Sequence, residues 1–428
     1  MEIVRRCHVF RISTTFIRTS TAIVLALGVA TTPASADVVQ DWNIQLLRVP
    51  AAVGPPQARL LAIMHVAVHD AINSITGDYE TYGPRVNAPF GASPAAAGAA
   101  AAHLVLMTLV PSNMIPTNPD YDGALEASLA NIPEPERTLG VKVGREAAGN
   151  ILALRQKDGF TTVVPYTPGT GPGAWVPTLP LFAPALLPGL GQVVPFALHR
   201  GDQFRPDGPP ALTSEEYAAD LNEVQLIGDA NGEALGHRTH AESATARFWL
   251  GNSIPIFQQI ARKISADRGL DLSEDARFFA LLSIAGADAY IAAWDAKYAY
   301  NFWRPVTAVR QADGDGNPAT IGDPNWLPLG PTPPFPDYVS GHTTYTGAFV
   351  HVLERLFGRN PYTYTVVNLG VPAGEQMRTY TSIGALSDEM IEARILAGIH
   401  FRTADRDGDR LGRQVAQFAL THVLRRAH

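Results

Sequence analysis

Three separated segments of the sequence combine cations, hydrogen-bond donors and histidines at spacings that suit the binding of an oxyanion. In the first, Lys297 and Arg304 stand seven residues apart. That spacing predicts that both lie on the same side of one helix, two turns from each other, with Pro305 ending the helix. Fixed cations neutralise the charge on anion oxygens. We expect this segment to supply two positive charges to one site.

The second segment, Ser340-Gly341-His342, comes directly before a helical pattern. The first turn of a helix offers unpaired backbone N–H groups and the positive end of the helix dipole, and these bind anions. Gly341 permits a close approach to the backbone, the Ser340 hydroxyl is a further donor, and His342 is a candidate acid–base group. The sequence therefore predicts an anion site where this helix begins.

The third segment contains Arg394 and His400, six residues apart. On a straight helix they would lie about 120° apart, so both can face one site only if they flank its edge. The three segments together supply three cations, a hydroxyl, backbone amides and two histidines. Such a set suits a phosphoryl group, or its five-coordinate analogue vanadate, with one imidazole on the axis.

Each of these residues alone also has a structural interpretation. Lys297 and Arg304 could belong to a solvated helix face, the second segment could be a helix cap, and Arg394 and His400 could be structural. The order of the three segments and their agreement in chemistry favour a functional site.

The composition limits what else the protein could be. The chain has 428 residues, of which 46% are hydrophobic, and can bury a large core without a disulfide or metal. Its single cysteine, Cys7, excludes a zinc site built from cysteines, an iron–sulfur cluster and a disulfide framework. Lys and Arg total 33 against 40 Asp and Glu, a net charge of −7, so binding to nucleic acid by phosphate neutralisation is not expected.

The N-terminal 36 residues have the pattern of a signal peptide. Four arginines precede a short apolar stretch at residues 22–30, and Ala34-Ser35-Ala36 forms a small-residue cleavage site. The sequence leaves open whether export uses the general or the twin-arginine route. We expect an exported protein, periplasmic or extracellular after cleavage. No later apolar run is expected to reach the roughly 18 residues of a membrane helix, so we expect no integral membrane contact.

Apolar spacing after the signal peptide predicts a mainly α fold in one domain, residues 37–428. We divide it into N-terminal helices at 37–164, an ordered loop rich in Pro and Gly at 165–210, and a catalytic helical half at 211–428. The loop has eight prolines between positions 165 and 195, which excludes a long helix or a central strand. Helices are predicted at residues 57–75, 94–109, 134–154, 214–227, 241–249, 257–266, 273–302, 341–357, 387–400 and 408–425.

The three chemical segments resemble the signature of the vanadium-dependent haloperoxidase and type 2 phosphatidic acid phosphatase (PAP2) superfamily, which is Lys-x6-Arg-Pro, Pro-Ser-Gly-His and Ser-Arg-x5-His. Here they stand at residues 297–305, 339–342 and 393–400. The resemblance extends to neighbouring residues and to the long loop, and it is strongest for the exported bacterial haloperoxidase-like branch. It implies a helical bundle of the vanadium haloperoxidase and acid phosphatase type.

The resemblance also implies roles for individual residues. His400 would be the axial ligand of the vanadium in vanadate, and His342 the acid–base residue. The residues that would bind the vanadate oxygens are Lys297, Arg304, Ser340, Gly341 and Arg394. The implied reaction is oxidation of halide by hydrogen peroxide to hypohalous acid, with vanadate as cofactor and phosphate able to occupy the same site.

Two alternatives remain open at this point. In a soluble acid phosphatase on the same scaffold, His400 would be the nucleophile that forms a phosphohistidine, and His342 would protonate the leaving alcohol of a phosphomonoester. A non-catalytic helical protein that binds oxyanions would need neither histidine for activity. An oligomer is compatible with every one of these readings.

Several positions depart from the superfamily pattern. Val339 replaces the motif proline, and Ala393 replaces a serine. Ala404 stands where the phosphatase pattern His-x3-Asp has its aspartate, which disfavours a phosphatase. Asn252 stands near the place where fungal chloroperoxidases carry a carboxylate that pairs with the acid–base histidine, so His342 would hold its proton less tightly. Phe335 resembles the phenylalanine of chloroperoxidases, where algal bromoperoxidases carry histidine.

Overall fold

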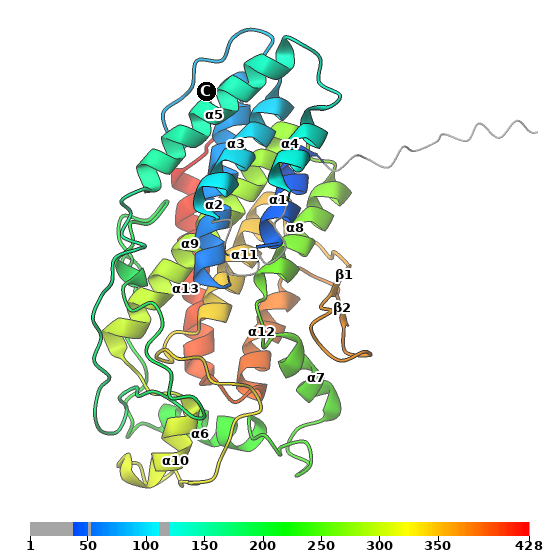
Figure 1. The fold of residues 1–428 in the computed structure, drawn as a ribbon. Helices are drawn as coiled ribbons and strands as arrows, with labels where there is room; N and C mark the ends of the chain where they lie inside the picture. The colour runs from blue at the N-terminus through cyan, green and yellow to red at the C-terminus, as the bar shows by residue number, and fades with distance from the viewer. Residues whose placement is uncertain (1–36, 50–52, 111–119, 428) are drawn as a thin grey trace, which may run out of the picture. The chain divides into compact units, whose positions relative to one another are not determined.

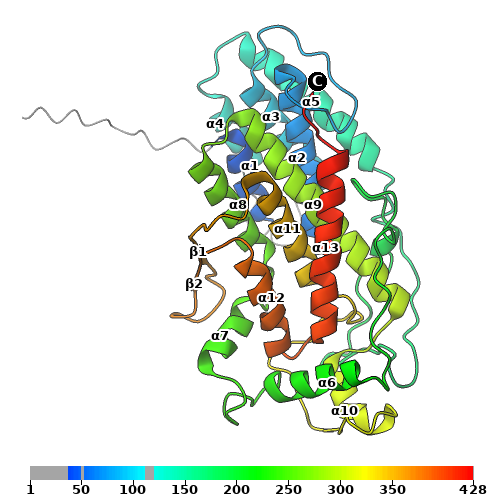
Figure 2. The ribbon, with the colours of Figure 1, turned by 180° about the vertical axis from the view of Figure 1, so that it is seen from behind.

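Three long helices of the C-terminal half pack side by side: α9 (Leu272–Tyr300), α11 (Gly341–Phe357) and α13 (Arg402–His422) (Figure 2). Glycines make the contact between α11 and α13 close. A Cβ on Gly412 would lie 1.9 Å from the carbonyl oxygen of Thr344, and one on Gly408 would lie 2.4 Å from the Thr343 hydroxyl. This packing brings the first turn of α11 next to the chain that enters α13.

The computed structural model describes residues 37–49, 53–110 and 120–427. The prediction of a mainly α fold is confirmed, because strands in these ranges form only one two-stranded antiparallel sheet. The remaining elements (Figure 1) are α1 (Val38–Leu47), α2 (Pro55–Thr76), α3 (Pro94–Leu109), α4 (Tyr121–Leu129), α5 (Glu136–Arg155), α6 (Glu215–Ile227), α7 (His240–Phe248), α8 (Ile254–Arg268), α10 (Pro305–Gln311), α12 (Ala385–Leu396), β1 (Tyr364–Val367) and β2 (Met377–Tyr380), with short 3-10 turns at Leu190–Gln192 and Ala312–Gly314. The predicted signal peptide, residues 1–36, lies outside the described residues.

Helix α2 joins the N-terminal helices to the C-terminal half, since it packs against α3, α5 and α9. Small residues permit close packing here too: a Cβ on Gly144 of α5 would lie 2.1 Å from the carbonyl oxygen of Ala97 in α3. Alanine-rich α3 has the bounds that the sequence predicts.

Helix α9 is the central element for the site, and it is buried along most of its length. Within the described ranges it is the one helix long and apolar enough to pass a length-and-composition test for a membrane span, so the expectation that no later segment reaches that length is wrong. The protein itself covers 94% of its most apolar window, as in the core helix of a folded domain.

The loop rich in Pro and Gly lies along α9, a position that the sequence did not predict. Asp288 of α9 is fully buried, and its carboxylate accepts the backbone N–H groups of Phe196, Ala197 and Leu198 at 2.6 to 2.9 Å. Farther along, the carbonyl of Leu186 accepts the Trp294 indole N–H at 3.2 Å. These bonds hold the loop in place as one wall of the site described below.

Candidate active site

The structure corrects the predicted position of Arg304. Helix α9 ends at Tyr300 because Asn301 adopts a left-handed conformation with φ of 51°, and Arg304 then caps α10, whose first residue is Pro305. Pro305 therefore begins a helix, where its missing N–H costs nothing, and does not end one. Lys297 and Arg304 consequently lie on different helices.

Lys297 and Arg304 still lie close together, because both contact the same aromatic ring. The Lys297 ammonium lies 4.9 Å from the centre of the Phe335 ring, and the Arg304 guanidinium carbon lies 4.8 Å from it. Lys297 Nζ donates to the carbonyls of Pro336 and Asp337, both at 2.9 Å, and Arg304 Nε donates to the Phe335 carbonyl at 2.8 Å. Both cations are fully buried and fixed by these contacts.

The segment Ser340-Gly341-His342 begins α11, as predicted, with Ser340 at the N-cap. The Ser340 N–H donates to the carbonyl of Ala404 at 3.0 Å, which ties the start of α11 to α13. A Cβ on Gly341 would lie 3.0 Å from the Trp294 ring, so a side chain here would crowd α9. The first turn of α11 is thus left open to an anion.

Arg394 and His400 approach the same site because the chain between them is not one continuous helix. The predicted helix through residue 400 is wrong, because α12 ends at Leu396 and Gly398 has a φ of 74°. The chain reverses there, so His400 lies between α12 and α13, which begins at residue 402 and not at the predicted 408. Arg394 stays on α12, buried, with Nη1 donating to the Trp249 carbonyl at 2.7 Å.

His400 contacts a carboxylate and a guanidinium. Its Nδ1 lies 2.8 Å from Oδ1 of Asp337, and its Nε2 lies 3.2 Å from Nη1 of Arg304. Asp337 is fully buried. Motif spacing alone gives Asp337 no role, since the contact joins two residues far apart in the chain.

A second buried carboxylate, Asp405 of α13, lies near Ser340 and Arg394. Burial raises the pKa of Asp405 well above its usual value, and the nearby Ser340 hydroxyl and Arg394 oppose that shift. Burial likewise raises the pKa of Asp337 to about 7, against the pull of Arg304 and Lys297. In the sequence, Asp405 stands one place after Ala404, the position of the aspartate in the phosphatase pattern.

Buried positive charge exceeds buried negative charge in this site. Three buried cations, Lys297, Arg304 and Arg394, stand against the two carboxylates Asp337 and Asp405. Burial lowers the pKa of Arg304 to about 10 and that of Arg394 to about 10. A buried charge is costly unless it is paired, so this arrangement favours a bound anion.

Three donors of the site are left without an acceptor. Arg304 Nη2, Arg394 Nε and the Ser340 hydroxyl are buried and have no hydrogen-bond partner among the described residues. A buried donor without a partner costs about 1–3 kcal/mol, which an oxyanion placed between these groups would recover. Together with the open first turn of α11, these free donors fit a tetrahedral oxyanion.

His342 stands at the edge of a cavity of about 300 Å³ next to this charged cluster. The walls are mostly apolar and include Leu186, Leu250, Tyr290, Trp294 and Phe335, and the lining also contains His342, Gly341 and His400. His342 Nε2 lies 3.2 Å from the carbonyl oxygen of Gly251. Burial lowers the pKa of His342 well below its usual value, and the charge of Arg394 adds to that shift.

Asn252 lines the same cavity, but its side-chain amide donates to Gln57 Oε1 at 2.7 Å, and the His342 ring contacts the Gly251 backbone. That His342 lacks a charged partner stays a prediction. Because burial lowers the pKa of His342 below the ordinary histidine value, its imidazole is neutral at neutral pH.

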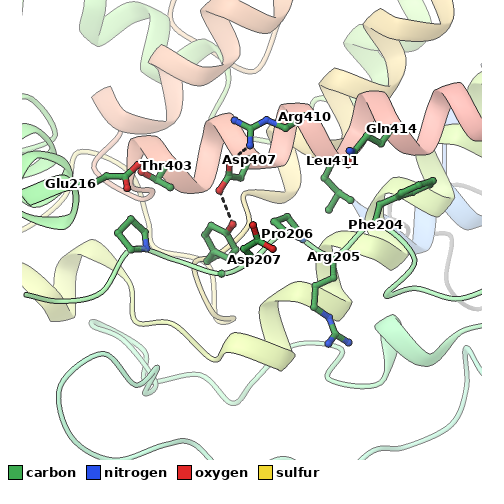
Figure 3. Close-up of a pocket in the computed structure, with 13 residues that line it drawn as sticks. Phe204, Arg205, Pro206, Asp207, Glu216, Thr403, Asp407, Arg410, Leu411 and Gln414 are labelled. Carbon is green, nitrogen blue, oxygen red and sulfur yellow. Dashed lines mark hydrogen bonds and ion pairs between the residues drawn. The ribbon is translucent and has the colours of Figure 1, made fainter. Parts of the chain in front are cut away.

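A larger, polar pocket of about 570 Å³ lies against α13 behind the segment that carries Asp337 (Figure 3). Its charged side chains pair with neighbours: Arg410 lies 3.1 Å from Asp407, and Asp407 accepts the Tyr338 hydroxyl at 2.6 Å. This pocket contains none of the predicted site residues. The pocket is relevant to the site only through the hydrogen bond between Tyr338 and Asp407, which anchors the segment before Ser340 to α13.

Two other histidines, His65 and His69, stand four apart on α2 and are packed core residues. His65 Nε2 lies 2.9 Å from Asn43 Nδ2, and His69 Nε2 lies 3.2 Å from the Glu80 carbonyl oxygen. In the part of the chain that the structure describes, no three His, Cys, Asp or Glu side chains gather to hold a metal ion.

Comparison with known proteins agrees with this geometry. Residues 277–428, which contain all three chemical segments, match the family profile described as the VCPO second helical-bundle domain. The chain is also 27% identical over 402 residues to vanadium chloroperoxidase from Curvularia inaequalis, a match that covers 74% of this chain and 65% of that protein. Over residues 277–428 the chain matches the vanadium haloperoxidase family, and it resembles members of that family in fold.

Solved structures of vanadium haloperoxidases share the fold. The structure titled as the first bacterial vanadium-dependent iodoperoxidase is 24% identical, covers 92% of this chain and 99% of its own, and superposes with a TM-score of 0.77. A holo-type bacterial vanadium-dependent chloroperoxidase is 16% identical, covers 86% and 93%, and gives a TM-score of 0.68. The chain spans just under two thirds of the length of the curated vanadium chloroperoxidase that it matches.

Proposed function

We propose that this protein is a vanadate-dependent haloperoxidase, which oxidises halide with hydrogen peroxide to hypohalous acid. The observation that carries the proposal is the convergence of three buried cations, with unpaired N–H groups, on His400, which lines an apolar cavity together with His342. The family relationship supports the same activity.

The residues present fit vanadate, because the unpaired donors of Arg304 and Arg394 need an oxyanion. Lys297, Arg304, Arg394, Ser340 and the Gly341 amide would bind its oxygens, and His400 would bind the vanadium. When bound, vanadate supplies Lewis acidity that makes peroxide oxygen susceptible to attack by halide, with no change of oxidation state at the metal.

His342 is placed to move a proton. The Gly251 carbonyl only accepts, so Nε2 of His342 carries the proton, and Nδ1 is left as the acceptor. The lowered pKa of His342, caused by burial and then by Arg394, keeps the imidazole neutral, as a base that takes a proton from hydrogen peroxide must be.

The cavity walls influence which anion reaches the site. Tyr290, Trp294 and Phe335 exclude much of the water around His342 and lower the local dielectric. Attraction between an anion and the buried cations is stronger in such surroundings than in water. A weakly hydrated halide enters an apolar cavity at less cost than a strongly hydrated ion, so we propose that iodide and bromide are preferred over chloride.

A phosphatase remains the second candidate, because the same donors fit the tetrahedral oxygens of phosphate. In that case His400 would attack phosphorus, and His342 would protonate the leaving alcohol. We also propose that the protein is exported, on the pattern of residues 1–36.

One paired assay separates the candidates. Purified protein is loaded with orthovanadate, desalted and tested for peroxide-dependent bromination of a phenolic dye, beside hydrolysis of p-nitrophenyl phosphate by the vanadate-free protein. We expect bromination that requires vanadate and is lost in His342→Ala. Phosphate release that vanadate inhibits, without bromination, would make the protein a phosphatase. Absence of both activities, with retained phosphate binding, would identify a non-catalytic oxyanion-binding protein.

A further inference from the structure

The contact between Asp337 and His400 links the anion site to a carboxylate that has no assigned role. Nδ1 of His400 lies 2.8 Å from Oδ1 of Asp337, and the two side chains are 2% and 0% exposed. The contact is an ion-pair distance and not an aligned hydrogen bond, because neither carboxylate oxygen of Asp337 has a hydrogen-bond partner among the described residues. A buried acceptor without a donor is costly, so a rotation of the His400 ring that aligns Nδ1–H with Oδ1 is favourable.

A second contact requires that Nδ1, and not Nε2, carries the proton of the neutral His400 ring. Nη1 of Arg304 lies 3.2 Å from His400 Nε2, and a guanidinium can donate but cannot accept. Nε2 must therefore be the unprotonated nitrogen, and Nδ1 carries the proton toward Asp337. The same Nη1 is 3.5 Å from Nδ1, farther than the carboxylate is.

Asp337 is itself held rigidly. Its backbone N–H donates to the Phe302 carbonyl and its carbonyl accepts from Lys297 Nζ, both at 2.9 Å. Arg304 Nη1 lies 3.5 Å from Oδ1 of Asp337, which places positive charge beside the carboxylate. The next residue, Tyr338, is bonded to Asp407 of α13. The carboxylate therefore has a fixed position relative to the imidazole.

We propose that Asp337 is a positioning residue for His400: it accepts the Nδ1 proton, fixes the ring orientation, and leaves the Nε2 lone pair free toward the cation cluster. This inference rests on the proposed oxyanion site. A histidine ligand is commonly oriented by a carboxylate at its other nitrogen.

Tautomer measurement tests this directly. In protein labelled with ¹⁵N-histidine, the ring nitrogens of His400 are identified by comparison with His400→Gln. We expect Nδ1 protonated and Nε2 unprotonated in the vanadate-free wild type, and a loss of this single tautomer in Asp337→Leu. Nε2 protonated in the wild type would overturn the proposal, whether or not any variant folds.

Binding provides a second readout that does not depend on turnover. Titrated with orthovanadate or inorganic phosphate, Asp337→Leu should bind about 10- to 100-fold more weakly than the wild type. Asp337→Asn, which keeps one acceptor oxygen, should lose less affinity for these anions than Asp337→Leu. The control is Asp220→Asn, which removes a carboxylate that accepts the Thr403 N–H at 3.0 Å and does not contact the His400 ring. The affinity of this control for orthovanadate or phosphate should stay within about threefold of the wild-type affinity. A tenfold change would correspond to about 1.4 kcal/mol, so the expected change is smaller than that.

The outcomes separate this inference from the proposed function. Unchanged binding and an unchanged tautomer in folded Asp337→Leu would reject the role of Asp337. A wild type that shows the expected tautomer and binds vanadate, but does not oxidise halide, would reject the haloperoxidase while leaving the role of Asp337 intact. Thermal unfolding of each variant shows whether it is folded, and Asp337→Asn replaces Asp337→Leu if the latter is not.

Discussion

Gly412 of α13 lies so close to Thr344 of α11 that a methyl group on Gly412 would come within 1.9 Å of the Thr344 carbonyl oxygen. Thr344 is one turn into the helix that begins at Gly341, and α13 begins directly after His400. The spacing of these two helices therefore sets the distance between the donors of α11 and the imidazole of His400.

Gly412→Ala is expected to destabilise the protein. The added Cβ meets backbone, which cannot move aside alone, and overpacking of this kind costs about 1–3 kcal/mol or more. Gly149→Ala in α5 is the matched control, because nothing lies within 4 Å of its added Cβ, and it should be stabilising by about 0.5–1 kcal/mol. Urea unfolding measures both. Equal stability of the two variants would mean that α11 and α13 are less tightly packed than described.

His342→Gln should separate binding from turnover. The variant keeps the three cations and His400, so its affinity for orthovanadate should change little. Halide oxidation should fall about 10²- to 10⁴-fold, the usual range for loss of a general base. Calorimetric binding and a dye-halogenation assay on the same preparation check this. Full turnover in His342→Gln would remove His342 from the proton transfer.

The acidic limit of activity depends on the His342 pKa. The base must be neutral, and its neutral fraction is lost as pH falls through that pKa. Burial lowers the pKa, with Arg394 adding to the effect, so activity should persist below pH 6.5, the ordinary histidine value.

Asn252→Asp should move that limit to higher pH, because a carboxylate in the same cavity favours the protonated imidazole. Asn325→Asp, on the exposed loop before residue 330, makes the same change of charge away from the cavity and should leave the profile unchanged. The measurement is kcat against pH at saturating vanadate. A shift to lower pH, or none, would contradict the placement of Asn252 near His342.

Arg394→Met should weaken oxyanion binding, because it removes a buried cation with an unpaired Nε. Charge-assisted hydrogen bonds contribute about 1.5–3 kcal/mol, so affinity for inorganic phosphate should fall about tenfold to a hundredfold. Arg410→Met, at the polar pocket of Figure 3, serves as the control and should bind like the wild type. Equal phosphate affinity in the two variants would exclude Arg394 from the site.

The helices with strong apolar periodicity could be predicted from the sequence. Residues 94–109 and 341–357 agree with the structure at both ends. The order of the three chemical segments predicts one candidate site, which stays a prediction. These features follow from local spacing and capping, which neighbouring residues determine.

The chain reversals around the site could not be predicted in this way. Asn301 is a non-glycine residue with positive φ, and Gly398 lies so close to Gly228 that a Cβ would be 2.4 Å from the Gly228 carbonyl oxygen. Both depend on tertiary packing. The Asp337–His400 contact is missed for the same reason, although a carboxylate three residues before Ser340 was a visible signal.

The most direct test of the central claim is a titration of vanadate-free protein with orthovanadate while bromide oxidation by hydrogen peroxide is measured. We predict that activity rises in proportion to bound vanadate, saturates at about one vanadate per chain, falls when phosphate competes, and is absent in His400→Ala. Bromide oxidation that is independent of vanadate, or that survives in His400→Ala, would contradict the account.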